Sequence, residues 1–142
     1  MTDLLVNIDV PDLAQALAFY ARAFGLRVTR RFGTDAAELG GWPVRLYLLE
    51  KPAGTLGAAD DPRRYRRHWT PVHLDVVVPD LIEALARALA AGARAEGEVR
   101  TEPWGRIATL SDPFGHGFCL LEFLGRGYDE IAVPDLDRPS PA

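Results

Sequence analysis

Two polar side chains among apolar strand residues could take part in chemistry: the imidazole of His73 and the carboxylate of Glu122. Side chains alternate along a strand, so His73 shares a face with Asp75 and points away from the helix-facing Leu74. Glu122 ends the last apolar segment of the chain, on the face of Leu120. If the two strands lie side by side, we expect His73 and Glu122 to project together from the concave side of a sheet. The two would then form a polar pair in an apolar cup. The plainest interpretation of His73 is a hydrogen-bonded histidine, and a functional role stays open at this point.

The elements that position these residues occur twice in the chain. The sequence VPDLAQALA begins at Val10 and VPDLIEALA begins at Val78, and the two are identical at seven of nine positions. The strand ending Leu-Leu-Glu at Glu50 likewise matches the one ending at Glu122. The chain therefore contains two copies of one module of about 50 residues.

Each copy predicts a strand, a helix and about three further strands. Asp12 is placed to cap the first helix, and Gly25 and Gly92 are placed to end the two helices. The expected elements are strands 4–10, 26–33, 37–41 and 44–50 with helix 13–24, then strands 72–78, 94–100, 106–111 and 118–123 with helix 81–91. The predicted boundaries are modules at 1–50 and 71–126, a linker at 51–70 and a tail at 127–142.

Composition is that of an ordinary globular chain. Sixteen bases against 20 acids give a net charge of −4, so charge offers no reason to expect nucleic acid or an anionic membrane as a partner. No apolar run approaches the ~18 residues of a membrane span, and the acidic start of the chain is unlike a signal peptide, which favours a cytoplasmic location. Cys119 is the single cysteine, which excludes an internal disulfide, and its apolar neighbours predict a buried small residue rather than a nucleophile.

The linker contains a basic run, Arg63-Arg64-Tyr65-Arg66-Arg67. Its surroundings are rich in Gly, Pro and Asp and have no periodicity, which is typical of a loop. One interpretation is a solvated loop, and the other is an anion clamp over the mouth of a site.

The repeated unit with its VPDL-type helix starts, together with DPFGHGFCLLEF near the end, resembles the vicinal oxygen chelate superfamily of glyoxalase I, bleomycin resistance proteins and extradiol dioxygenases. The resemblance covers about residues 4 to 124. It implies an α+β fold in which two tandem βαβββ modules form a curled mixed β-sheet cup with helices on the outer face. It also implies a divalent metal in the cup and a homodimer with sites shared between subunits.

The same resemblance suggests site residues. Metal-binding members carry a His or Gln six residues before the helix-start proline and a Glu at the end of the last strand of each module. This implies His73, Glu122 and Glu50 as metal ligands, with Leu5 in place of the first module's imidazole, and Glu122 as the base. Mn²⁺, Ni²⁺, Fe²⁺ and Zn²⁺ all suit such a set. Asn7 and Asp75 occupy equivalent positions and are expected either to bind substrate or to form a polar pair across the module interface.

Two functions fit this pattern. The first is a metal-dependent lyase or isomerase of glyoxalase type that acts on a small oxygenated metabolite or thiol conjugate. The alternative is a non-catalytic protein of bleomycin-resistance type that sequesters a small molecule, which the apolar Leu5 favours. Extradiol dioxygenase chemistry is the least favoured, because it requires two His and one carboxylate on iron, and His73 is the one His at a ligand position. His116 is expected to cap its own turn.

Overall fold

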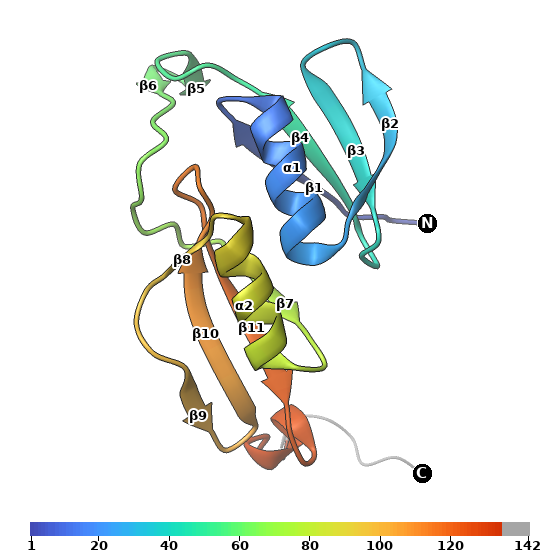
Figure 1. Ribbon diagram of the computed structural model, residues 1–142, viewed down its shortest axis with the longest axis vertical. Helices are drawn as coiled ribbons and strands as arrows, with labels where there is room; N and C mark the ends of the chain where they lie inside the picture. Colours follow the sequence, from blue (N-terminus) through green and yellow to red (C-terminus); the bar gives the residue numbers. More distant parts are fainter. Residues whose placement is uncertain (135–142) are drawn as a thin grey trace.

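The computed structural model describes residues 1–134, so residues 135–142 of the predicted tail lie outside the described part. The first module contains β1 (Leu5–Val10), α1 (Leu13–Phe24), β2 (Arg27–Phe32), β3 (Ala36–Gly40) and β4 (Arg45–Glu50). Its strands form one sheet in the order β1-β4-β3-β2 (Figure 1). Strand β1 runs parallel to β4, and the other pairs are antiparallel.

The second module repeats this connectivity. It contains β7 (Leu74–Val77), α2 (Leu81–Ala91), β8 (Arg94–Ala95), β9 (Arg100–Glu102), β10 (Gly105–Ser111) and β11 (Gly117–Phe123). The sheet order is β7-β11-β10-β8, with β9 also paired to β10, and β7 runs parallel to β11. The linker holds a small hairpin of β5 (Leu56–Ala58) and β6 (Asp61–Pro62), and a short 3-10 helix, η1 (Gly127–Glu130), follows β11.

Both helices begin and end where the repeat predicts. The Asp12 carboxylate accepts a hydrogen bond from the backbone N–H of Gln15, and Asp80 does the same for Glu83 at the start of α2. Gly25 ends α1 in the left-handed conformation, at φ 68°. The repeated Val-Pro-Asp-Leu sequence therefore sets the first turn of each helix.

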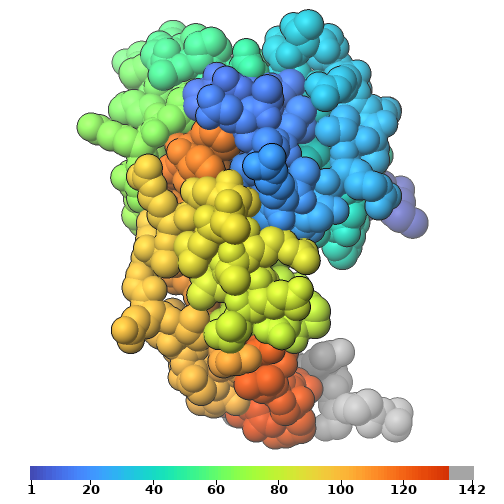
Figure 2. Space-filling model, in the orientation of Figure 1, coloured from blue at the N-terminus to red at the C-terminus, as the bar shows by residue number. Residues whose placement is uncertain are grey.

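The helices cover one face of the two sheets and pack against each other where the modules meet (Figures 1 and 2). Phe24 of α1 also packs edge-on against Phe118 of β11, with ring centroids 5.4 Å apart. One buried cluster fills the space between helices and sheets, and it includes Leu13, Phe19, Leu46, Leu48, Leu81, Ala88, Leu110, Phe118 and Leu120. We call the other side of each sheet, which neither α1 nor α2 covers, the open face of that module. The predicted α+β architecture of two βαβββ modules with outer helices is confirmed.

The structure differs from the expected strands at several places. The segment predicted as one strand at 94–100 is two short strands, because Gly97 adopts φ 104° between them and breaks the extended backbone. The strand predicted at 72–78 is limited to Leu74–Val77. None of the helices in residues 1–134 is both long enough and apolar enough to span a membrane.

Candidate metal centre

Three side chains with different donor atoms meet on the open face of the second module. Parallel pairing of β7 with β11 sets Asp75 opposite Cys119, and His73 precedes β7 on the same face. The Nε2 atom of His73 lies 3.3 Å from Oδ1 of Asp75. One ligand atom from each of His73, Asp75 and Cys119 lies within 4.8 Å of the other two. The fold thus gathers an imidazole, a carboxylate and a thiol at one point.

These three residues line a hollow of about 260 Å³. The indole of Trp69 lies beside the His73 ring, with centroids 5.8 Å apart. The Thr109 hydroxyl is 3.7 Å from the Cys119 sulfur. Arg100 and Ile107 complete the surroundings on the β9 and β10 side. The hollow therefore combines polar donors with apolar and aromatic walls, as small-molecule sites do.

The Cys119 thiol is partly buried, where the sequence predicted a buried small apolar residue. Burial raises the pKa of the thiol, the hydrogen bond with Thr109 opposes this, and the nearby Asp75 carboxylate adds to the increase. A thiol with a raised pKa is a poor nucleophile, but a bound cation would favour its thiolate form.

Glu122 does not lie in this hollow. It is on the helix-facing side of β11 and 7 % exposed. Its Oε2 accepts a hydrogen bond from Nε of Arg106 at 2.7 Å and forms an ion pair with Nη2 of the same guanidinium at 2.5 Å. Leu74 pairs with Phe118, so His73 is level with Gly117, and Glu122 lies five residues further along, on the order of 16 Å at ~3.3 Å per residue. The expectation that His73 and Glu122 share one hollow is wrong.

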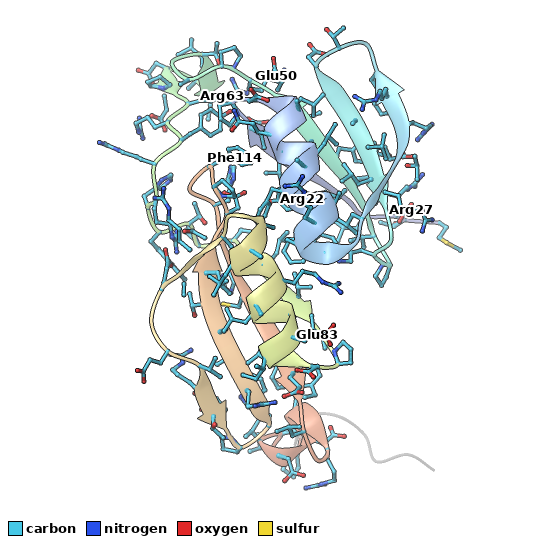
Figure 3. The ribbon with its side chains drawn as sticks, in the orientation of Figure 1. Arg22, Arg27, Glu50, Arg63, Glu83 and Phe114 are labelled. Carbon is cyan, nitrogen blue, oxygen red and sulfur yellow. The ribbon has the colours of Figure 1, made fainter. Side chains whose placement is uncertain are left out.

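Glu50 also faces the helix layer, at the equivalent position of β4. Its Oε2 accepts a hydrogen bond from the backbone N–H of Leu13 at 2.8 Å, so it occupies the N-terminus of α1 (Figure 3). A carboxylate there satisfies an unpaired helix N–H and interacts favourably with the helix dipole. The structure does not bring Glu50, Glu122 and His73 together, and it supports none of the metal contacts expected of the two glutamates.

Asn7 and Asp75 lie on the open faces of different modules. Asn7 is on β1 opposite Tyr47, whereas Asp75 is on β7 beside His73. No hydrogen bond joins Asn7 to Asp75 in residues 1–134, so the polar pair expected across the interface is not formed. Leu5 is 45 % exposed on the open face of the first module.

The first module's open face carries a polar network that the sequence analysis missed. Glu38 accepts hydrogen bonds from Arg30, Tyr47 and Thr29. The hydrogen bond from Arg30, followed by those from Tyr47 and Thr29, lowers the pKa of Glu38 to about 2. The Glu38 carboxylate is therefore ionised and fully engaged. The alternation of side chains along β2, β3 and β4 is the sequence signal that could have placed these polar residues on one face.

The sequence signal that could have placed Cys119 beside Asp75 is its position in the alternation of side chains along the last strand. Asp75 follows the apolar Leu74 in one strand, and Cys119 follows the apolar Phe118 in the other. If Leu74 and Phe118 both face the core, Asp75 and Cys119 both face away from it. His116, by contrast, behaves as predicted: its Nδ1 lies 2.8 Å from Oδ2 of Asp112 and it closes its own turn.

A family model described as a glyoxalase-like domain matches residues 5–121 of the chain. The chain belongs to the glyoxalase-like domain family. A search of curated protein sequences gives no match to this glyoxalase-like protein. The predicted membership of the vicinal oxygen chelate superfamily is confirmed by the family match and by similar solved structures.

Several solved structures share the fold of this glyoxalase-like protein. A glyoxalase/bleomycin resistance protein/dioxygenase family enzyme from Burkholderia phytofirmans PsJN has a TM-score of 0.69 at 20 % identity, over 87 % of this chain and 100 % of that one. The fosfomycin resistance protein FosX from Listeria monocytogenes has a TM-score of 0.65 at 17 % identity, over 87 % and 95 %. Lactoylglutathione lyase from Agrobacterium tumefaciens has a TM-score of 0.60 at 19 % identity, over 85 % and 92 %. At such identities the likeness establishes the fold and leaves the activity to the site.

Proposed function

We propose that this glyoxalase-like protein binds a divalent transition-metal ion through His73, Asp75 and Cys119. We further propose that the ion binds a small oxygenated metabolite or thiol conjugate, on which the protein acts as a lyase or isomerase. The observation that carries the proposal is the convergence of three donor atoms within 4.8 Å on an open sheet face. These residues replace the set of His73, Glu50 and Glu122 suggested by the resemblance.

The three donors fit a metal ion of the borderline class. Zinc accepts imidazole nitrogen, carboxylate oxygen and thiolate sulfur, and its catalytic sites keep three protein ligands and one open position. Among Mn²⁺, Ni²⁺, Fe²⁺ and Zn²⁺, a thiolate ligand disfavours Mn²⁺. When bound, such an ion would polarise a substrate oxygen as a Lewis acid.

The chain's own residues have defined roles in this proposal. Asp75 is the carboxylate that lines the hollow, so it replaces Glu122 as the group that accepts a substrate proton. Trp69 and Ile107 supply apolar contact area for the substrate body. Arg100 lines the same hollow and supplies positive charge for oxygen atoms that become negative during the reaction.

Metal analysis of the purified protein tests the proposal. We expect the wild-type chain, dialysed against zinc and then buffer, to retain about one equivalent, because catalytic zinc is typically held by three protein ligands. His73→Ala and Cys119→Ser should each retain almost none by elemental analysis. His68→Ala is the matched control, because His68 lies in the linker outside the cluster, and it should retain wild-type zinc. Stoichiometric zinc in His73→Ala would rule out the proposed centre.

Sequestration without chemistry is the second candidate function. It is favoured by the positions of Glu50 and Glu122, since neither the expected base, Glu122, nor the expected ligand Glu50 reaches the hollow. Zinc-loaded protein that binds a thiol conjugate reversibly, and returns it unchanged, would support sequestration over the lyase or isomerase.

We also propose that two copies of the chain pair through their open faces. Exposed apolar side chains occur there on both modules, including Leu5 and Val77 at 45 % and 55 % exposure. Light scattering should give twice the mass of one chain, and Val77→Asp should give a monomer, since a charge buried in an apolar interface is unfavourable. Ile82→Asp is the control, because Ile82 is 54 % exposed on α2, on the helix side. An unchanged mass for Val77→Asp would contradict this interface.

A further inference from the structure

A second hollow, which we call the seam pocket, lies where the two modules and the linker meet. It has a volume of about 420 Å³ and shares His73 as a wall with the candidate metal centre. Its walls come from β1, the linker, the start of β7 and the turn between β10 and β11, where Phe114 is found (Figure 3). All three histidines of the chain, together with Arg64 and Arg66, line it.

The basic run of the linker divides into two pairs with different surroundings. Arg63 donates to Asp9 at 2.7 Å, and Arg67 donates to Glu96 at 2.6 and 3.0 Å. These two ion pairs attach the linker to the first and the second module respectively. Arg64 and Arg66 lie between them in the sequence, are more exposed, and line the seam pocket. Arg64 also forms an exposed ion pair with Asp61 at 2.9 Å, so Arg66 is the one of the two without a protein partner in residues 1–134.

The backbone of Arg66 lies directly against the turn between β10 and β11. A Cβ placed on Gly115 would lie 2.8 Å from the carbonyl carbon of Arg66, so the linker and the turn are in direct backbone contact. In residues 1–134 the Arg66 guanidinium takes part in no hydrogen bond or ion pair. An arginine with unused donors at a pocket suits an oxyanion, because its planar fork matches carboxylate and phosphate oxygens.

The charge balance of the pocket points to the same ligand. Asp9 is the one acidic residue of its lining, and Arg63 already neutralises it at 2.7 Å. Nδ1 of His116 is occupied by Asp112, which leaves the other ring nitrogen of this wall residue for a ligand. Apolar walls from Val6, Ile8, Leu74 and Phe118 surround the polar groups. The lining is thus cationic at the linker and apolar toward the sheets.

We infer that the seam pocket binds the phosphate or carboxylate group of a small metabolite, with Arg66 as the principal anion contact and Arg64 as a second cation. This site adjoins the proposed metal centre, with which it shares the His73 wall, and its anion contacts do not depend on a bound ion. It resolves the two interpretations of the basic run: Arg63 and Arg67 attach the linker, and Arg64 and Arg66 bind the anion.

Titration of the EDTA-treated, full-length protein with inorganic phosphate at constant ionic strength tests this inference. We expect saturable amide shifts in NMR spectra at Phe114 and Gly115, which line the seam pocket and not the hollow of the metal centre. Arg66→Gln should weaken binding about tenfold, since a hydrogen bond to a charged group is worth roughly that factor. Arg31→Gln, which removes the same charge from an exposed position on β2, should bind as the wild type does.

Equal phosphate affinity in Arg66→Gln and the wild type, or shifts that never saturate, would overturn the inference. A parallel titration with acetate distinguishes the two sources of the anion. Tighter binding of phosphate assigns the pocket to phosphorylated metabolites, and tighter binding of acetate assigns it to carboxylates. Because the protein is metal-free throughout, failure of the zinc proposal leaves this result unaffected.

Discussion

Replacing Asp112 with alanine is expected to lower the free energy of unfolding by about 3–5 kcal/mol. Asp112 is 2 % exposed, and its carboxylate accepts hydrogen bonds from the backbone N–H groups of Phe114 and His116, both at 2.9 Å. It also accepts one from the Tyr20 hydroxyl at 2.8 Å and contacts Nδ1 of His116 at 2.8 Å. The alanine variant leaves this set of donors without its acceptor.

The effect is large because the network joins the two modules. Tyr20 lies on α1 of the first module, and Asp112 begins the turn between β10 and β11 of the second. Burial, followed by the charge of Asp112, raises the pKa of Tyr20 well above its usual value, so the phenol stays protonated and donates. Loss of Asp112 therefore weakens the turn and its attachment to α1 together.

Urea unfolding followed by circular dichroism measures this prediction. Tyr20→Phe, which removes one donor and keeps the ring, should cost about 1 kcal/mol. Asp60→Ala, at an exposed position of the linker, should stay within about 0.5 kcal/mol of the wild type. The account of Asp112 fails if its alanine variant is as stable as Asp60→Ala.

Gly105→Ala should also be strongly destabilising, by about 3 kcal/mol or more. Gly105 begins β10 at φ 151°, opposite Phe123 of β11. A Cβ at this position would lie 1.9 Å from the carbonyl oxygen of Glu122, which is backbone and has no freedom to move aside. The substitution must separate the ends of β10 and β11.

Gly54→Ala is the matched control for the backbone conformation. Gly54 has φ 86°, but no atom lies within 4 Å of an added Cβ, so its alanine variant reports left-handed strain alone. We expect it to cost about 1 kcal/mol. The same urea titration compares the two variants, and equal costs would mean that the contact with Glu122 is not what excludes a side chain at Gly105.

Local sequence rules were sufficient for the helices and the modular plan. Asp12 and Asp80 each cap a helix through hydrogen bonds within three residues, so the caps are readable without tertiary information. The assignment of Leu74 to the helix side was also correct, and Val76 shares that side, because only one of the two faces of β7 is wholly apolar.

For the last strand, β11, the alternation of side chains did not show which face meets the helices, and that choice determines which residues form the site. Both faces of β11 are apolar apart from single residues, with Phe118, Leu120 and Glu122 on one and Cys119, Leu121 and Phe123 on the other. The alternation of side chains along the strand separates these two sets of residues, but it does not show which set faces the helices. We assigned Glu122 to the open face, and the structure puts it beside Arg106 under the helix layer.

By itself, the sequence determined that two βαβββ modules are present, where their helices begin and end, and that His73 and Asp75 share a face. Only the tertiary structure decided that Cys119 is their neighbour and that the glutamates Glu50 and Glu122 are not. The physical reason is that helix caps and the alternation of side chains along a strand depend only on residues close together in the sequence. The face that a doubly apolar strand turns to the core depends on helices docking from elsewhere in the chain.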